Sequence, residues 1–394
     1  MNKLPKHLQD IAEQEYPTFS DDEFLRRRKL FDANMAERGV SCVIVCASER
    51  VGAAVQWFTG WPTSHDAVII VRPGEQPILY VNHYNHVPLA ELMARLTDVR
   101  WGGPITLDTA LEDLKKLGES GKKIGVVGKL TTNQHKKLED ASSELIDMNS
   151  DYSRNRWIKS DEEMDWLRIG AHYSDVAVAA IPENLTLGMN EHELGAAVEN
   201  SYKPYGMQNR THYFLINQMD DDGYCVPRQH GSMRPVQNGD VVAVEMSAEF
   251  WSYAGQVLRT FTIGADPTPL YKDLHDVGMA AYHAICDVLK PGCRPEEIID
   301  AAGVIEDAGF SVWDDLVHGY GGGYLPPVLG SKSRSILPVP DMTLEEGMCL
   351  VVQPNVITTD NKAGIQTGEM VRITKTGFES MHAYPQGLHR IDPK

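Results

Sequence analysis

The first part of the chain alternates between helical and strand patterns of apolar residues. Residues 21–38 follow a helical pattern, with Ser20 before it as an N-cap and Gly39 after it as a stop. The apolar run at 40–47 indicates a buried strand. The other elements predicted here are strands at 67–71, 77–81 and 123–127 and helices at 86–95 and 107–117. This alternation predicts an α/β layer with a mixed sheet.

A second pattern begins at Arg154. Ser160 is a natural N-cap, and Glu163, three residues later, completes the signature of a capping box. Longer helical patterns follow at 191–202 and 270–289, and apolar strands lie between them. We therefore predict two domains, residues 1–153 and 154–394, in an α/β (α+β) protein.

Composition narrows the class of protein. The chain has 394 residues, 42% of them hydrophobic and 23% charged, which is typical of a globular enzyme. A net charge of −18 argues against nucleic acid or an anionic membrane as a partner. The polar N-terminus does not resemble a signal peptide, and no apolar run is long enough to span a membrane. Scattered cysteines without CxxC spacing predict buried thiols, so we expect a cytoplasmic location.

Four segments of the C-terminal part carry a family resemblance. They read RNRWIKSDEE from Arg154, GDVVAVEMSAEFWSYAGQVLRTF from Gly239, HGYGG from His318 and GMCLVVQP from Gly347. Together they resemble the creatinase, prolidase and aminopeptidase P family, the pita-bread or peptidase M24 enzymes. The resemblance implies a creatinase-type N-terminal α/β domain followed by a pita-bread catalytic domain.

The family keeps its metal ligands at five positions, and in this chain all of them except that of His318 are altered. They hold Glu245, Gln256, His318, Gln353 and Gly368, and Glu369 stands one residue beyond the last of them. Two divalent cations need several anionic ligands to offset their repulsion and lost hydration. We therefore predict no metal and no other cofactor, in a metal-independent branch resembling creatinase and ectoine hydrolase. One weakly held ion, or ligands on neighbouring residues, remains the alternative.

Three residues are predicted to be catalytic. Glu245 lies in an apolar strand, where a carboxylate is costly unless it is paired or functional, and it would act as nucleophile or base. His230 stands near the position of the family's proton shuttle and would be the acid/base. His318 would donate a hydrogen bond to substrate or orient Glu245. A buried structural Glu245 and a loop histidine without a catalytic role are the alternatives.

Further residues are predicted to bind substrate by hydrogen bonding or by forming an aromatic wall. They are Tyr253, Gln256, Tyr324, Gln353, Gln366 and Glu369, with Trp61 and His65 from the N-terminal domain. Ordinary polar burial or core packing is the alternative for each of them.

These residues predict a metal-independent hydrolase of a non-peptide C–N bond, in a cyclic amidine, amide, urea or guanidino compound. A divergent metal-dependent Xaa-Pro peptidase or lyase, or an inactive binding protein of the same fold, is the alternative. The expected partner is a small-molecule substrate. The resemblance also implies a homodimer in which the N-terminal domain of one subunit lies near the active site of the other.

Overall fold

The computed structural model describes residues 3–47 and 53–393. The chain forms two compact units. One comprises residues 15–156, and the other comprises residues 157–394 together with the first 14 residues. The boundary that we expect between residues 153 and 154 stays a prediction.

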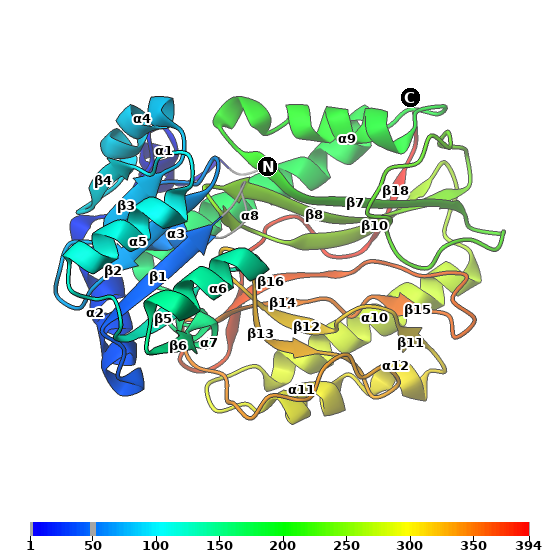
Figure 1. Cartoon of the computed structure of the whole chain (residues 1–394). Coiled ribbons are helices and arrows are strands. Elements are labelled where there is room, and N and C mark those ends of the chain that lie inside the picture. Colours follow the sequence, from blue (N-terminus) through cyan, green and yellow to red (C-terminus); the bar gives the residue numbers. More distant parts are fainter. Residues whose placement is uncertain (1–2, 48–52, 394) are drawn as a thin grey trace. The chain divides into compact units, whose positions relative to one another are not determined.

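The N-terminal unit contains a six-stranded mixed sheet in the order β4-β3-β2-β1-β5-β6, within the described residues (Figure 1). Its strands are β1 (Cys42–Ala47), β2 (Ala67–Val71), β3 (Ile78–Val81), β4 (Asp98–Trp101), β5 (Lys123–Val127) and β6 (Glu144–Asp147). Its helices are α2 (Asp21–Arg38), α3 (Ala53–Thr59), the 3-10 helix η1 (Tyr84–His86), α4 (Val87–Met93), α5 (Thr106–Lys116), α6 (Thr132–Ala141) and α7 (Asn149–Arg154). Strand β1 runs antiparallel to β2 and parallel to β5, so the predicted mixed sheet is confirmed.

Local sequence signals account for the first helix of this unit. The Ser20 hydroxyl accepts a hydrogen bond from the Glu23 backbone N–H at 3.1 Å, and Gly39 ends α2 with φ +65°. Both ends agree with the prediction, because a hydroxyl caps the first turn and glycine adopts the left-handed conformation without strain. Strand β1 is buried along nearly its whole length, as its apolar run predicts. The predicted helix at 86–95 is shorter in the structure, spanning Val87–Met93.

The C-terminal unit is built on a ten-stranded sheet whose main path is β13-β12-β14-β16-β10-β8-β7, within the described residues. Its strands are β7 (Gln208–Gln218), β8 (Asp240–Phe250), β9 (Tyr253–Ala254), β10 (Val257–Ile263), β12 (Val317–Tyr320), β13 (Tyr324–Leu329), β14 (Cys349–Val352), β16 (Gly368–Ile373), β17 (Phe378–Ser380) and β18 (Leu388–Ile391). A separate pair is β11 (Ser311–Val312) with β15 (Val356–Ile357). Its helices are α1 (Lys6–Ala12), α8 (Asp161–Asn184), α9 (Glu191–Asn200), η2 (Lys203–Tyr205), α10 (Pro269–Val288), α11 (Pro295–Ala301) and α12 (Val304–Asp307).

Helices cover the two halves of this sheet separately. Helix α8 packs on β8, β9 and β10, whereas α10 packs on β14 of the sheet and on β15 of the separate pair; Figure 1 shows α8 and α10 beside different strands. The capping box predicted at Ser160 is confirmed, because the Ser160 and Glu163 side chains exchange hydrogen bonds with each other's backbone N–H. Gly255 permits the close contact with α8, because a Cβ there would lie 2.2 Å from the Ala171 Cα. The strands that carry Glu245 (β8), His318 (β12), Tyr324 (β13) and Glu369 (β16) all belong to this sheet.

Two sequence predictions concern the chain as a whole. All six cysteines are free and buried, as predicted. Among the residues described, no helix combines the length and apolar character that crossing a membrane requires.

Candidate functional site

A cavity of about 680 Å³ opens beside β8 in the C-terminal unit. Three carboxylates, one guanidinium and several aromatic rings border it. The lining residues are Thr211, Tyr213, Tyr224, Cys225, Val226, Pro227, Arg228, Gln229, Glu245, Trp313, Asp314, Asp315, Tyr324, Gln353 and Asn361. A cavity of this volume accommodates a small organic molecule.

Glu245 reaches this cavity from the middle of β8. Its neighbours in the sheet are Tyr213 on β7 and Leu258 on β10. The Gln256 Nε2 donates a hydrogen bond to the Glu245 Oε1 at 2.8 Å. Burial, followed by the nearby charges of Asp314 and Asp315, raises the pKa of Glu245 to about 8. The Glu245 carboxyl therefore keeps its proton at neutral pH.

Two glutamines continue from Glu245 in a chain of hydrogen bonds. The Gln256 Nε2 also donates to the Gln353 Oε1 at 3.1 Å, and the Gln353 Nε2 donates to the Asp315 backbone carbonyl at 3.0 Å. Both glutamines are buried. The amides thus link the Glu245 carboxyl to the segment that precedes β12.

His318 is completely buried on β12. Its Nδ1 lies 3.1 Å from the Gly319 backbone oxygen. Because a carbonyl oxygen only accepts, Nδ1 carries the proton of the neutral ring. Burial lowers the pKa of His318, which favours that neutral form. Its Nε2 lies 3.9 Å from the Asp315 Oδ2.

Tyr324 completes this corner of the cavity. Its ring stacks on the His318 ring, with centroids 3.8 Å apart and planes inclined by 12°. Its hydroxyl donates to the Asp315 carboxylate, 3.1 Å from each oxygen. The structure therefore brings together five of the predicted site residues, namely Glu245, Gln256, His318, Tyr324 and Gln353.

Asp314 and Asp315, which also line the cavity and add two carboxylates to it, are not among the residues predicted from the sequence. Asp315 stands three residues before His318, and this spacing was the available signal. Burial and the neighbouring Asp315 charge raise the pKa of Asp314 to about 7. Arg228 was also missed as a site residue. It lines the cavity through a loop that approaches β7 only in the folded chain.

The structure places other predicted site residues elsewhere. The Tyr253 hydroxyl donates to Glu163 on α8 at 2.8 Å, and His230 is exposed in the loop after Arg228. Gln366 is buried, and neither atom of its side-chain amide bonds to another of the residues that the structure describes. Trp61 and His65 belong to the N-terminal unit. The functional roles of these five residues stay predictions.

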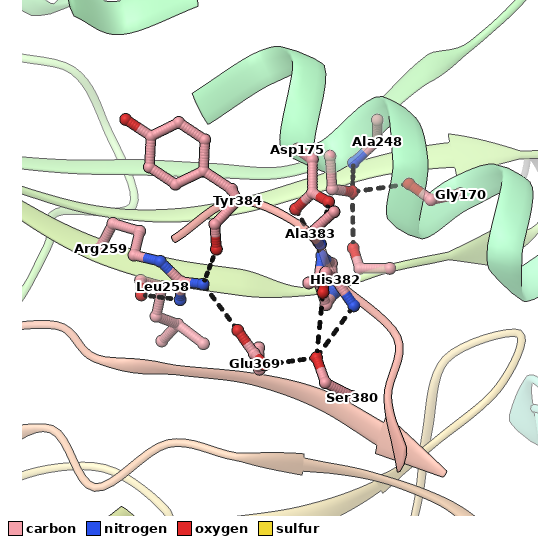
Figure 2. Close-up of polar contacts among 12 residues, drawn as sticks. Gly170, Asp175, Ala248, Leu258, Arg259, Glu369, Ser380, His382, Ala383 and Tyr384 are labelled. Carbon is pink, nitrogen blue, oxygen red and sulfur yellow. Dashed lines mark hydrogen bonds and ion pairs between the residues drawn. The ribbon is translucent and has the colours of Figure 1, made fainter. Parts of the chain in front are cut away.

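Glu369 takes part in a separate buried network (Figure 2). The Arg259 Nη2 donates to the Glu369 Oε2 at 2.6 Å, and the hydroxyls of Tyr282 and Ser380 donate to its Oε1. The same guanidinium donates to the backbone carbonyl of Tyr384 at 2.7 Å. The Glu369 carboxylate is thus bound by partners outside the cavity lining.

The residues present do not fit the dinuclear metal centre that the family resemblance implies. Gly368 contributes no ligand, Gln256 and Gln353 bond to each other, and Glu369 bonds to Arg259. Within residues 3–47 and 53–393, no group of three or more His, Cys, Asp or Glu side chains is arranged to hold a metal ion.

Gly368 also lacks room for a side chain. Its φ is +121°, and a Cβ would lie 1.9 Å from the Val352 backbone oxygen. We expect Gly368→Ala to lower the free energy of unfolding by roughly 2–4 kcal/mol, from backbone strain and displacement of β14. Chemical denaturation would measure this loss. Gly377→Ala is the control, because its Cβ would meet nothing closer than 3.9 Å, and equal stabilities of the two variants would contradict the expectation.

The raised pKa of Glu245 predicts how the free energy of unfolding depends on pH. The pKa of Glu245 is about 8, against an ordinary value of 4.5. Between these values the unfolded chain releases a proton that the folded chain keeps, so the free energy of unfolding falls as pH rises. We expect Tm to decrease from about pH 5 to about pH 8, and Glu245→Gln to flatten that decrease. Calorimetry over this pH range measures both curves, and parallel curves would contradict the assignment.

Comparison with known proteins places the chain in a family. The profile described as metallopeptidase family M24 matches residues 165–375, and the creatinase/prolidase N-terminal domain matches residues 27–158. The chain is 25% identical over 280 residues to the Xaa-Pro dipeptidase of Pyrococcus horikoshii, covering 69% of this chain and 74% of that protein. It is 21% identical over 400 residues to the creatinase of Bacillus sp., covering 97% and 96%.

A solved structure shows the same two-domain fold. The prolidase of Pyrococcus horikoshii superposes with a TM-score of 0.76 at 21% identity, covering 92% of this chain and 99% of that structure. The predicted creatinase-type N-terminal domain and pita-bread C-terminal domain are thereby confirmed.

The comparisons correct the predicted reaction. Xaa-Pro dipeptidases recur among the relatives, at 23–28% identity, and they are metallopeptidases by family. The prediction of a metal-independent hydrolase for a non-peptide C–N bond is therefore wrong, and a peptidase agrees better with these relatives. The prediction of a metal-independent hydrolase rested on the single residues at the metal-ligand positions. The Xaa-Pro dipeptidases, by contrast, match this chain over most of its length. Because the M24 profile matches more than half of its residues, this chain belongs to metallopeptidase family M24.

Proposed function

We propose that this chain is a hydrolase that cleaves the amide bond of a dipeptide-sized substrate of the Xaa-Pro type. The observation that carries the proposal is the cavity of about 680 Å³ bordered by the protonated Glu245 carboxyl. The cavity is large enough for a dipeptide. Relatives named Xaa-Pro dipeptidases support the choice of bond.

Glu245 is proposed to move the proton. In hydrolysis the water oxygen bonds to the carbonyl carbon, the C–N bond breaks and the leaving nitrogen gains a proton. A carboxyl with a pKa of about 8 can give its proton to that nitrogen and regain one from the attacking water. The hydrogen bond from Gln256 at 2.8 Å orients the carboxyl for both transfers.

Arg228 is proposed to bind the substrate carboxylate. It lines the cavity, and its Nη1 lies 3.2 Å from the Glu191 Oε1, so one carboxylate already fixes its position. The planar guanidinium has further N–H donors with which to bind a second carboxylate. The cavity is lined both by the Arg228 guanidinium and by carboxyl groups, and this combination favours a zwitterionic substrate such as a free dipeptide.

Incubation of the purified chain with a panel of Xaa-Pro dipeptides tests this function, with free proline followed by chromatography. The assay is run after exhaustive chelation and again with added manganese, zinc or iron, while bound metal is determined by elemental analysis. Release of proline by wild type and its loss in Glu245→Gln are the expected results. Failure to release proline under every metal condition would contradict the proposal.

A second candidate is a binding protein that retains the fold without turnover. It is favoured by Gln256 and Gln353, which bond to each other at positions where the family keeps metal ligands. Calorimetric titration with the same dipeptides separates the two candidates, because a binding protein would bind the dipeptides and release no proline.

We further propose that the chain forms a homodimer, with His65 of one subunit bordering the cavity of the other, whereas the predicted contribution of Trp61 does not fit, because its side chain is buried within its own unit. The resemblance to the creatinase branch supports this arrangement. Light scattering on the eluting protein measures the mass in solution. A monomer that retains full turnover would contradict the shared site.

A further inference from the structure

An exposed aromatic side chain stands at the cavity. Tyr224 lines the cavity, and 60% of its surface is exposed to solvent. Covering such a ring with apolar atoms of a ligand is favourable, because the contact removes apolar surface from water. Tyr224 is therefore a candidate for binding an apolar part of the substrate.

The backbone that carries Tyr224 is held in place on both sides. The Asn217 Nδ2, on β7, donates a hydrogen bond to the Tyr224 backbone oxygen at 2.8 Å. The next residue along the chain lies against a second loop, because a Cβ on Gly364 would be only 2.1 Å from the Cys225 backbone oxygen. A side chain on a backbone fixed in this way is pre-organised, so binding a ligand costs less ordering entropy.

The Tyr224 ring also lies against the guanidinium that is proposed to bind the substrate carboxylate. The Arg228 Cζ is 4.3 Å from the centre of the ring. The Arg228 backbone N–H donates to the Phe214 carbonyl on β7 at 2.9 Å, and its Nη1 donates to the Glu191 Oε1 at 3.2 Å. Because both residues line the cavity, the loop presents an aromatic ring and a cation side by side to a ligand.

This arrangement matches one end of an Xaa-Pro dipeptide. The free carboxylate and the pyrrolidine ring of proline are attached to the same carbon. A carboxylate bound by Arg228 therefore places the pyrrolidine ring close to the Tyr224 ring. The positive charge of Arg228 disfavours a basic side chain at this place, whereas an apolar ring can cover the aromatic face without burying a charge.

We propose that Tyr224 is a specificity-determining residue whose ring, beside Arg228, binds an apolar carboxyl-terminal residue such as proline. This inference rests on the proposed function and identifies which part of the dipeptide the ring recognises. A carboxyl-terminal glycine offers the same carboxylate to Arg228 but has no side chain to cover the Tyr224 ring. The subsite thus favours Xaa-Pro over Xaa-Gly through binding, and not through the proton transfer at Glu245.

Two matched dipeptides test the proposal in binding and in turnover. Alanyl-proline and alanyl-glycine are titrated calorimetrically into Glu245→Gln, in which turnover is expected to be lost, and kcat/KM for both is measured with Glu245 in place. Each measurement is repeated with Tyr224→Ala or Tyr224→Phe. Tyr205→Ala is the matched control, because this tyrosine is 58% exposed in the same unit and lies outside the cavity lining.

The expected result is a selective loss for the proline dipeptide. Tyr224→Ala should weaken binding of alanyl-proline about 5- to 30-fold and lower its kcat/KM by a similar factor, while alanyl-glycine changes less than about twofold. Tyr224→Phe keeps the ring and should stay within about threefold of the parent for both dipeptides. Tyr205→Ala should leave both unchanged. The parent itself should bind alanyl-proline at least about fivefold more tightly than alanyl-glycine, a comparison that needs no folded variant at position 224.

The outcomes distinguish this inference from the proposed function. If alanyl-proline binds and loses affinity in Tyr224→Ala, but no dipeptide is cleaved with Glu245 in place, the subsite is supported and the peptidase is contradicted. Cleavage of alanyl-proline with an unchanged kcat/KM in Tyr224→Ala would overturn the subsite and leave the peptidase standing. Equal losses for the two dipeptides would also overturn it, because they would show that the variant disturbs Arg228 and not a contact with the proline ring. Equal affinity of the parent for both dipeptides would overturn it as well.

Discussion

Substitution of Glu245 by glutamine should reduce kcat for Xaa-Pro dipeptides about 10²- to 10⁴-fold, which is the usual contribution of a general acid–base. Glutamine keeps the shape of the side chain but cannot release or regain a proton. The pKa of about 8 makes Glu245 suited to this transfer near neutral pH. KM should change little, since the hydrogen-bonded chain through Gln256 and Gln353 can persist with an amide at position 245. Initial rates of proline release measure both constants.

Glu249→Gln is the control for this substitution. Glu249 lies on the same strand, four residues along, and pairs with Arg210 at 3.4 Å without lining the cavity. We expect the kcat of Glu249→Gln to stay within about threefold of wild type, whereas the kcat of Glu245→Gln falls by the much larger factor expected for an acid–base residue. If Glu245→Gln retains wild-type kcat, Glu245 is not the proton carrier. If both variants lose activity equally, the loss results from disturbance of strand β8 and not from removal of the Glu245 carboxyl.

Substitution of Arg259 by methionine should lower the free energy of unfolding by about 3–5 kcal/mol, which corresponds to a decrease in Tm of roughly 6–15 °C. Arg259 is buried, and its guanidinium bonds to Glu369 and to the Tyr384 backbone carbonyl (Figure 2). It also bonds to the backbone carbonyls of Gly368 and Pro385. Removing it leaves the Glu369 carboxylate buried without its counter-charge. Chemical denaturation and calorimetry measure the loss.

A double variant and a surface control make this expectation specific. Arg259→Met combined with Glu369→Gln should recover part of the lost stability, because the second change removes the unpaired charge. Arg390→Met breaks an exposed pair with Asp266 and should change stability by less than about 1 kcal/mol. If the double variant is no more stable than Arg259→Met, the guanidinium acts mainly through its carbonyl contacts.

The C-terminal segment depends on the same network. The Asp175 carboxylate on α8 accepts from the His382 Nδ1 at 2.8 Å and from the Ala383 backbone N–H at 2.6 Å (Figure 2). Although burial alone would raise the pKa of Asp175, these contacts with His382 and Ala383 lower it. Arg259 and Asp175 thus hold neighbouring parts of one segment to the sheet and to α8. This explains why Glu369, although adjacent in sequence to a metal-ligand position, is bound to a structural partner.

Much of the local structure follows from the sequence by itself. The caps at Ser20 and Ser160 are determined by hydrogen bonds between residues three apart, so they can be recognised without knowledge of the fold. The apolar run that forms β1 is recognisable for a similar reason, because a strand buried on both faces needs continuous apolar side chains. The altered residues at 245, 256 and 353 could also be identified from the sequence, because the motif residues on either side of them keep the identity and the order found in the family.

The tertiary structure alone decided which side chains share the cavity. Asp314 and Asp315 meet Glu245 across about 70 residues of chain, and Arg228 reaches the same cavity from a loop. Glu369 turns toward Arg259 because successive side chains of a strand point to opposite faces of the sheet. The sequence alone determined the local elements and the chemical types available. The pairing of distant strands decided which of those groups can act together, because the cost of burying each charge depends on neighbours that only the folded chain supplies.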